Sequence, residues 1–315
     1  MKTTADLSCT IGTLALDSPV IVASGVWPMD PSLWPAGSMQ GVGAICSKGL
    51  TLEPKTGNEG TRLCETPCGV LNSIGLENPG IRSFLDDFLP LIERTGAPVI
   101  LNVAFGDCGE LGRIFDVVSE TPGCISAVEL NVSCPNVRSG GMEWGKDPLA
   151  ASEAVKKTRA MWNGPLWVKL SPQAPDIGSV AVAVEESGAD ALVVANTWLG
   201  TAIDVNARKP VFKRVFAGLS GPAVFPLALR LVWDVAARVS IPVIGCGGIT
   251  RHEHALAMIM AGARAVEIGS GQMVSANCAR DIRQGIETYL DENGFSSLAE
   301  LCGAARLSGG NDNEC

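Results

Sequence analysis

Residues 19–31 read PVIVASGVWPMDP, an apolar run that gives way to a glycine turn and two prolines. Short runs rich in Val and Ile and bounded by Pro and Gly are typical of buried β-strands. In a doubly wound nucleotide-binding sheet, the first strand continues into a G-x-G-x-x-G turn. Because residues 23–31 lack that spacing, the stretch favours a closed barrel over an open sheet.

Apolar strands of this kind alternate along the chain with longer amphipathic segments. We predict helices with one apolar and one charged face over residues 81–96, 151–162, 176–188 and 226–240. Such alternation is typical of parallel βα units, and eight units make an α/β fold of the TIM (β/α)8 barrel type. The eight predicted strands cover residues 19–24, 43–48, 98–104, 127–132, 166–170, 191–196, 242–247 and 265–269.

The length of 315 residues exceeds the roughly 250 residues of a simple barrel. The surplus falls in residues 49–80 and 197–221, which follow predicted strands, so we expect both as insertions at the C-terminal face of the barrel. No linker or change of composition divides the chain, and 46% of its residues are hydrophobic. We therefore expect a single domain spanning residues 1–315.

The charge balance bears on the partners of the protein. The chain has 33 acidic and 24 basic residues, and no Lys/Arg cluster offsets its net charge of −9. Nucleic acid is therefore not an expected partner. The start of the chain shows no continuous apolar signal segment, and no later run is long enough to cross a bilayer. We expect a cytoplasmic protein without a membrane partner.

Eleven cysteines are scattered through apolar segments of a chain that shows no secretory signal. We expect reduced thiols, most of them small core residues. The closest pair lies in the stretch LCETPCG at residues 63–69, but no second pair completes a zinc or iron-sulfur ligand set, and no metal is expected. The pattern assigns no role to Cys64, Cys68, Cys302 or Cys315.

Two predicted strands end in lysine, Lys48 and Lys169. The active site of a TIM barrel lies at the carboxyl ends of its strands, so both side chains are expected near it. A lysine that points into the barrel needs an anionic partner, because burying an unpaired charge is costly. A snorkelling surface lysine is the alternative for each. The two together indicate an anionic ligand.

Glycines follow the last two strands, at Gly247–Gly248 and at Gly269 before Ser270. Loops at these positions of a barrel commonly bind phosphate through backbone N–H groups. Tight βα turns alone would also account for either loop. Their joint occurrence after the last two strands favours a phosphate site.

Polar residues at other strand ends suggest a planar ligand. Asn131 and Asn196 end apolar runs, and their amides offer paired donors and acceptors. His252 and His254 do not follow a strand, and residues two apart do not share a helix face, so we expect both on the surface. Cys134, just past the fourth strand, is then the best-placed residue for proton transfer.

The chain resembles the class 1 dihydroorotate dehydrogenases over residues 14–271. The resemblance rests on the motifs GVLNSIGLENPG at 69–80, ELNVSCPNV at 129–137, VKLSP at 168–172, AGLSGPA at 217–223 and IPVIGCGGI at 241–249. It implies an FMN-binding TIM barrel that oxidises (S)-dihydroorotate to orotate in pyrimidine (UMP) biosynthesis. The chain departs from its relatives at VWPMDPSLWP, residues 26–35, and at IGSGQM, residues 268–273.

The resemblance also implies roles for individual residues. Cys134 would be the base that removes a proton from C5 of the substrate while hydride passes from C6 to flavin N5, and residues 134–148 would form a mobile lid. The implied FMN contacts are Ser24, Lys48, Gly49, Asn102, Asn131, Lys169, Ala195, Gly221, Gly247, Gly248, Gly269 and Ser270. The implied substrate contacts are Lys48, Asn72, Ser73, Ile74, Gly75, Leu76, Asn131, Asn196 and Thr197.

The continuation SCPNVRSGG, residues 133–141, resembles the NAD-linked subtype of the family. In that subtype an iron-sulfur flavoprotein partner carries FAD, a 2Fe-2S cluster and the NAD site, and a homodimer core binds two partners as a heterotetramer. A fumarate-linked stand-alone enzyme and a dihydropyrimidine-type dehydrogenase are alternatives within the class. From other classes, a Schiff-base aldolase using Lys169 and a non-catalytic barrel stay open.

Overall fold

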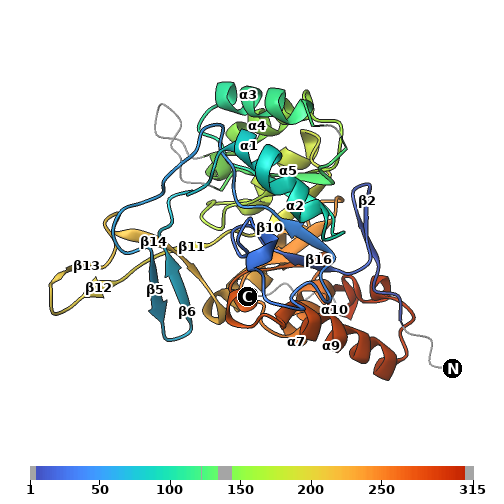
Figure 1. Ribbon diagram of the computed structural model, residues 1–315. Coiled ribbons are helices and arrows are strands. Elements are labelled where there is room, and N and C mark those ends of the chain that lie inside the picture. Colours follow the sequence, from blue (N-terminus) through green and yellow to red (C-terminus); the bar gives the residue numbers. More distant parts are fainter. Residues whose placement is uncertain (1–4, 122, 134–143, 309–315) are drawn as a thin grey trace.

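The computed structural model describes residues 5–121, 123–133 and 144–308. Its centre is a closed barrel of parallel strands in the order β10-β15-β16-β3-β4-β7-β8-β9 (Figure 1). Helices lie between successive strands and around the barrel, so the predicted TIM barrel is confirmed. All eight predicted strands are present, as β3 (Val20–Val22), β4 (Ala44–Cys46), β7 (Val99–Val103), β8 (Ala127–Asn131), β9 (Leu166–Lys169), β10 (Ala191–Val194), β15 (Val243–Cys246) and β16 (Ala263–Ile268).

Each barrel strand is apolar because both of its faces are buried. In β7 all five residues are buried; Ile100 packs with the barrel interior, and Val99 and Leu101 pack with the surrounding helices. Successive side chains of a strand point to opposite faces, so every second residue reaches the interior. This alternation puts Glu129, Asn131 and Lys169 of β8 and β9 on the inward side, with Asn131 paired to Lys169.

The outer helices carry the amphipathic pattern expected from the sequence. Asp107, Asp147 and Asp176 accept hydrogen bonds from backbone N–H groups at the starts of α3, α4 and α5. The helices are α1 (Ile81–Ser83), α2 (Leu89–Glu93), α3 (Cys108–Ser119), α4 (Pro148–Arg159), α5 (Ile177–Glu186), α6 (Phe225–Ala236), α7 (His252–Met260), α8 (Ser270–Val274), α9 (Cys278–Asn293) and α10 (Ala304–Ser308).

Shorter turns of other types join these elements. The helix predicted over residues 81–96 contains a π-helical segment, η2 (Phe84–Phe88), just before Pro90. Proline has no N–H to donate to the preceding turn. The backbone hydrogen bonds there join residues five apart instead of four. The remaining turns are 3-10 helices: η1 (Pro31–Leu33), η3 (Trp144–Lys146), η4 (Pro222–Val224) and η5 (Leu298–Leu301).

A hairpin of β1 (Cys9–Ile11) and β2 (Leu14–Leu16) covers the amino end of the barrel. Ile11 and Leu16 are 0% and 1% exposed and pack with the inward-facing residues Ile21 and Trp167. Since the hairpin closes this end, a ligand can enter the barrel only at the carboxyl ends of the strands.

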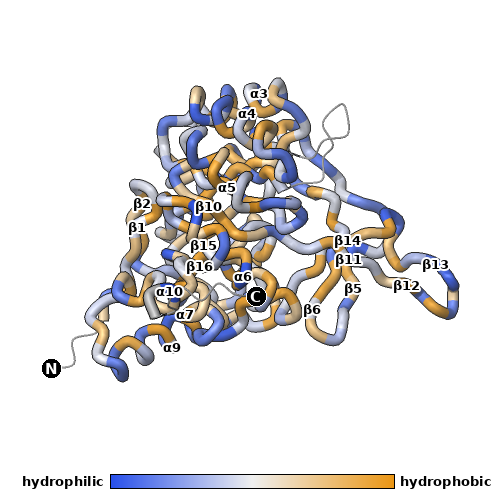
Figure 2. The backbone as a smooth tube through the Cα atoms, turned by 180° about the vertical axis from the view of Figure 1, so that it is seen from behind, coloured by the Kyte–Doolittle hydropathy of each residue, from blue (hydrophilic) through white to orange (hydrophobic). Residues whose placement is uncertain are grey.

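The two long insertions come together in a four-stranded antiparallel sheet, in the order β11-β14-β6-β5. Its strands are β5 (Leu63–Thr66), β6 (Gly69–Asn72), β11 (Trp198–Thr201) and β14 (Phe216–Ser220). The sheet projects to one side of the barrel in Figure 1, beyond which extends the hairpin of β12 (Ile203–Asp204) and β13 (Lys209–Pro210). Figure 2 shows hydrophilic and hydrophobic stretches in this hairpin, in which Ile203 and Val205 are 56% and 78% exposed. Both insertions follow the carboxyl ends of barrel strands, as predicted.

No helix among the described residues is both long and apolar enough to cross a membrane.

Candidate active site

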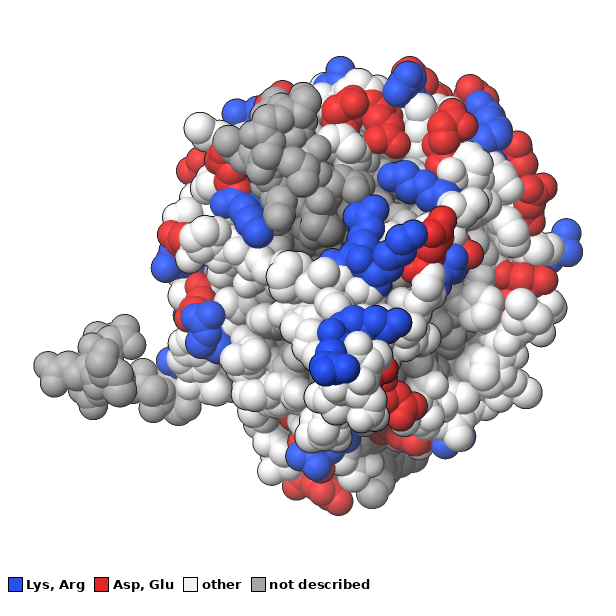
Figure 3. All heavy atoms as spheres, turned by 90° about the vertical axis from the view of Figure 1, so that its left-hand side faces the viewer, with Lys and Arg blue, Asp and Glu red and all other residues white. Residues whose placement is uncertain are grey.

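The carboxyl ends of the barrel strands bring Lys48, Asn102 and Lys169 to one end of the molecule. All three follow or end a barrel strand, and Asn102 and Lys169 are 0% and 5% exposed. Figure 3 looks onto the side from which the small sheet projects, and Lys and Arg side chains lie near the middle of this face. A positively charged surface of this kind suits an anionic ligand.

Lys48 lies in a tight pocket beside the first βα turn. A Cβ atom on Gly25 would come within 3.0 Å of Lys48 Nζ, so the glycine makes room for the lysine. Burial lowers the pKa of Lys48, and the nearby charge of Glu77 partly opposes this. Among the described residues, no acceptor forms a hydrogen bond with the Lys48 ammonium. It is a desolvated donor available to an anion.

The loop after β6 returns over the ends of β4 and β7. A Cβ on Gly49 would lie 2.9 Å from Asn102 Oδ1 and 3.5 Å from Leu76 Cδ2, which makes these three residues neighbours. Leu76 adopts a positive φ of 56°, rare for a residue with a side chain, and so marks a strained loop. Asn58 donates to the backbone and side-chain oxygens of Ser73 and anchors the loop.

Asn72 and Thr197 meet at Gly218 of β14. Asn72 Nδ2 donates to Gly218 O at 3.0 Å, and a Cβ on Gly218 would lie 2.4 Å from Thr197 Oγ1. A side chain at Gly218 would therefore clash with both elements. Asn72 and Thr197 belong to different insertions, and the family resemblance implies that both contact the substrate. The two insertions therefore meet at these residues.

Asn131 and Asn196 form a second polar cluster with Ser133. Asn131 Oδ1 accepts from Ser133 Oγ at 2.7 Å and from Asn196 Nδ2 at 3.5 Å, and Asn196 Nδ2 also donates to Ser133 Oγ. Asn196 Oδ1 in turn accepts from the N–H of Thr197. Ser133 was not predicted; its place between the two asparagines in space is invisible in the sequence.

The glycine loops after β15 and β16 also adjoin one another. Gly248 has a φ of 70°, and a Cβ there would lie 2.6 Å from Phe225 N at the start of α6. A Cβ on Gly271 would lie 2.5 Å from Ile249 O, so the two loops touch. Gly221 packs closely against Gly69 of the small sheet. These contacts admit only glycine and leave backbone N–H groups near the strand ends.

The prediction that both histidines lie on the surface is wrong for His254. Its ring stacks on Phe225 with centroids 4.1 Å apart, and its Nδ1 accepts from Thr250 N at 3.3 Å. Burial lowers the pKa of His254, and Arg251 lowers it further. The helix start folds back onto the glycine loop after β15, which places His254 beneath that loop.

The sequence analysis missed a charged cluster inside the barrel. Lys169 Nζ donates to Glu267 Oε2 at 2.6 Å and to Glu129 Oε1 at 3.3 Å, and both carboxyl groups are 0% exposed. Burial acts to lower the pKa of Lys169, but the two carboxyl groups outweigh it and raise the pKa well above its usual value. The sequence does contain a sign of this cluster, since one glutamate interrupts each of the apolar stretches AVELNV and AVEIG.

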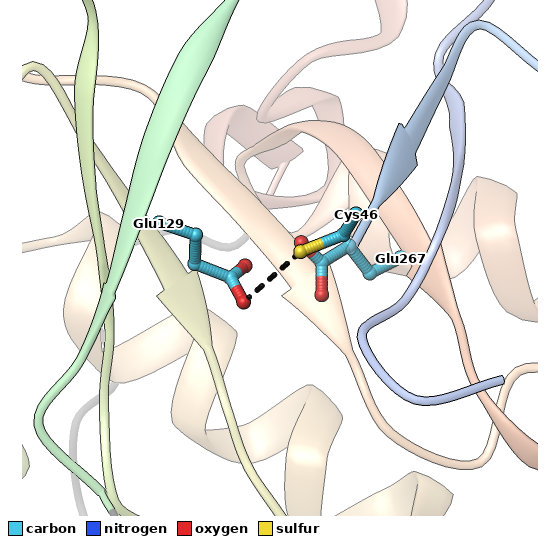
Figure 4. Close-up of side chains that lie close together, drawn as sticks. All are labelled: Cys46, Glu129 and Glu267. Carbon is cyan, nitrogen blue, oxygen red and sulfur yellow. Dashed lines mark hydrogen bonds between the residues drawn. The ribbon is translucent and has the colours of Figure 1, made fainter. Parts of the chain in front are cut away.

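Cys46, Glu129 and Glu267 point toward one another in the barrel interior (Figure 4). Their Sγ and carboxylate oxygens lie within 4.8 Å of each other, a spacing that also occurs in metal sites. The Lys169 ammonium, however, already lies between the carboxyl groups and supplies a positive charge. Burial raises the pKa of Cys46 well above its usual value, with Glu129 adding to the effect, so its thiol is protonated.

Comparison with known proteins identifies the family. The family model described as dihydroorotate dehydrogenase matches residues 6–290. The chain belongs to the dihydroorotate dehydrogenase family.

Curated members of this family resemble the chain over almost its whole length. A protein of Desulforamulus reducens is 45% identical over 302 residues, which cover 96% of this chain and 99% of that protein. A protein of Trichlorobacter lovleyi is 43% identical, covering 95% and 98%, and one of Geotalea uraniireducens is 42% identical, also covering 95% and 98%. Each is named "Dihydroorotate dehydrogenase B (NAD(+)), catalytic subunit".

Membership of the dihydroorotate dehydrogenase family confirms the predicted family and makes the protein an oxidoreductase acting on a CH–CH bond. It also removes support from the aldolase interpretation. A Schiff-base lysine needs a lowered pKa to be nucleophilic, whereas that of Lys169 is raised. Cys134, the predicted base, and the rest of the stretch 134–143 lie outside the described residues.

Proposed function

We propose that this chain is the catalytic subunit of an NAD-linked dihydroorotate dehydrogenase, which oxidises (S)-dihydroorotate to orotate in UMP biosynthesis. The observation that carries the proposal is the set of donors at the barrel mouth. Lys48 is desolvated and unpaired within the described part of the chain, and Asn72, Asn131 and Asn196 lie around the same opening. A planar amide ring with one carboxylate matches these groups.

The residues present fit FMN. Asn102 Oδ1 is buried and accepts no hydrogen bond from the described residues, and a Cβ on Gly269 would meet nothing within 4 Å, so that loop has open space for a phosphate. The residues that would hold FMN, one per chain, are Ser24, Lys48, Gly49, Asn102, Asn131, Lys169, Ala195, Gly221, Gly247, Gly248, Gly269 and Ser270. When bound, FMN supplies the hydride acceptor.

The protein's own groups then bind and orient the substrate. Lys48 pairs with the substrate carboxylate, and the amides of Asn131 and Asn196 hold the ring. The strained loop that contains Leu76 lies on the other side of the substrate. Cys134 accepts the C5 proton. The proposed substrate contacts are Lys48, Asn72, Ser73, Ile74, Gly75, Leu76, Asn131, Asn196 and Thr197.

The relatives' names mark them as catalytic subunits, which supports a partner subunit for this chain. We propose an iron-sulfur flavoprotein partner that carries FAD and a 2Fe-2S cluster and passes electrons to NAD. A homodimer core with two partners, a cytoplasmic location and a single domain complete the proposal. The bridge between Asp6 and Ser297 joins the two ends of the described chain and supports one domain.

The visible absorbance of the purified chain tests this proposal. Under anaerobic conditions, we expect flavin bands that bleach when dihydroorotate is added and do not bleach with dihydrouracil. A chain that stays colourless after incubation with FMN would contradict the proposal. Bleaching by dihydrouracil would favour the dihydropyrimidine-type alternative. Reoxidation by fumarate without a partner would favour the stand-alone subtype.

The role of Cys134 has a separate test. A free thiol has a pKa near 8.5, so a cysteine base is mostly protonated at neutral pH and the rate of flavin reduction should rise with pH. Single-turnover reduction between about pH 6 and pH 9.5 measures this. We expect Cys134→Ala to lose the rate, and Cys68→Ser, at an exposed thiol, to retain it. A flat profile in the unmodified chain would remove Cys134 from this role.

A further inference from the structure

Two glutamates and one lysine share the closed interior of the barrel. Glu129 of β8 and Glu267 of β16 are both 0% exposed, and Lys169 of β9 lies between them. The other polar side chains around this cluster are neutral and come from four strands: Cys46 of β4, Asn102 of β7, Asn131 of β8 and Cys246 of β15. Burial raises the pKa of Cys246 to about 12, so no further charge offsets the two carboxyl groups.

Two carboxylate oxygens of the cluster receive no hydrogen bond from the described residues.

 The fourth neutral neighbour, Asn131 of β8, pairs with Lys169 and takes its hydrogen bonds from Ser133 and Asn196, not from the cluster. Glu129 Oε1 accepts from Lys169, from Cys46 at 3.4 Å and from Asn102 Nδ2. Glu129 Oε2 and Glu267 Oε1 are buried and receive no hydrogen bond from any described residue.

The two carboxyl groups also face each other, with an oxygen of each within 4.8 Å of the other. An ionised carboxylate can only accept, so a hydrogen bond between the two groups needs a proton on one of them. The charge balance requires the same proton. Two ionised glutamates beside one ammonium would leave a net negative charge in a fully buried site, which is unfavourable.

We propose that Glu129 and Glu267 share a single proton and, as a neutralising dyad, hold the Lys169 ammonium in position at the barrel mouth. The proton supplies the missing donor between the carboxyl groups, and the remaining negative charge balances Lys169. Burial and the neighbouring Glu129 raise the pKa of Glu267 well above its usual value, in agreement with a retained proton.

The dyad leaves Lys169 with a donor to spare. An ammonium has three N–H groups, and two of them are directed to Glu267 Oε2 and Glu129 Oε1. The third is available to a ligand above the strand end. On the proposed function this ligand is the flavin ring, whose reduced form is anionic, so Glu129 and Glu267 are positioning residues that act through Lys169.

Infrared spectroscopy of the full chain, without added flavin, tests the shared proton directly. At pH 7 we expect the carbonyl stretch of a buried protonated carboxylic acid. Glu129→Gln and Glu267→Gln should each abolish it, because the one remaining carboxyl group ionises against Lys169. Glu292→Gln, at an exposed position of α9, is the control and should leave the band unchanged.

Two results would overturn the dyad. The first is a spectrum of the unmodified chain that contains no carbonyl band of the kind that both variants remove. The second is a band that survives Glu129→Gln, since the proton would then belong to Glu267 regardless of its neighbour. If the glutamine variants do not fold, Lys169→Met gives an independent test. Without the ammonium both carboxyl groups should be protonated, and the band should grow about twofold; an unchanged band would contradict the proposal.

The positioning role has its own measurement, the midpoint potential of the bound flavin. The double variant Glu129→Gln/Glu267→Gln leaves Lys169 without an anion. The Lys169 ammonium should then lose its proton, and the midpoint potential of the flavin should fall. Each single variant keeps one carboxylate and should retain the potential. An unchanged potential in the double variant would refute positioning. A chain that binds no flavin would refute only the proposed function, because the infrared test needs none.

Discussion

At the scale of single residues, burial decides which charged groups are available for chemistry. Lys48 and Lys169 both end barrel strands, yet their surroundings differ. Lys169 has two carboxyl partners, whereas Lys48 has no acceptor within the described chain. An unpaired, desolvated ammonium binds an anion strongly because it regains the interaction that burial removed. This difference supports the proposal that Lys48 faces the substrate, whereas Lys169 is held by Glu129 and Glu267.

Replacing Lys48 with methionine should weaken orotate binding. The loss of one charge-assisted hydrogen bond costs about 2 kcal/mol, or roughly 30-fold in Kd. Titration of orotate against flavin absorbance measures this. Lys213→Met is the matched control, since the Lys213 side chain is 69% exposed and pairs only with Glu59 at the surface. Equal affinity in Lys48→Met and the unmodified chain would contradict the assignment.

His254 should make stability depend on pH. Its pKa is lowered in the folded state by burial, so the unfolded chain takes up a proton first as the pH falls. Stability should therefore drop below about pH 6.5, the ordinary value of histidine. Urea unfolding at pH 7.5 and pH 5.5 should show a smaller drop in His254→Gln than in the unmodified chain. His252→Gln, at a side chain 40% exposed, is the control; an equal drop in all three chains would disprove the link.

At the scale of elements, the glycine loop after β15 depends on α6. Gly248 combines a positive φ with close contact to the first backbone nitrogen of that helix. His254 supports the same loop from α7. The loop is thus held by two helices, which would keep its N–H groups oriented for the proposed phosphate.

Gly248→Ala should therefore distort the loop. We expect destabilisation of about 1–3 kcal/mol from backbone strain and FMN affinity lower by roughly 30-fold, the value of one charge-assisted hydrogen bond of about 2 kcal/mol. Flavin fluorescence titration measures the affinity. Gly294→Ala shares the positive φ, at 75°, but has nothing within 4 Å of its added Cβ. It should lose some stability and no FMN affinity. Equal FMN affinity in both variants would argue against a phosphate site at this loop.

At the scale of the whole molecule, one face of the small sheet carries exposed apolar side chains beside Asn72, which is in register with Leu63 and Gly218. Leu63, Leu199 and Phe216 lie on one side of it and are 52%, 53% and 62% exposed. Apolar groups clustered on an exposed sheet commonly mark an interface between proteins. The proposed homodimer core would cover such a face.

Phe216→Asp should then dissociate the homodimer, because a charge would be buried in the interface. Analytical ultracentrifugation at micromolar concentration should show a shift from dimer to monomer with an unchanged circular dichroism spectrum. Leu149→Asp on α4, at an 80% exposed position away from the sheet, should remain dimeric. A dimeric Phe216→Asp variant would place the interface elsewhere.

The barrel and most of its mouth were predictable because they depend on local patterns. Apolar strands alternating with amphipathic helices require parallel βα units, and a polar residue ending such a strand must lie at the mouth. Lys48, Asn131 and Asn196 follow from this rule alone. The contact of Ser133 with Asn196 and that of Asn72 with Gly218 do not, because both join residues far apart in the sequence that meet only in space.

The amino-acid sequence by itself determined the barrel, the end at which its site lies and the chemical character of the residues there, since strand periodicity and strand ends are local properties. Only the tertiary structure decided how those residues are paired. Glu129 and Glu267 are 138 positions apart and meet because closure of the barrel brings β16 across the interior from the neighbouring strands β8 and β9. Charge balance in a buried site is a property of all the strands together, and no single stretch of sequence contains it.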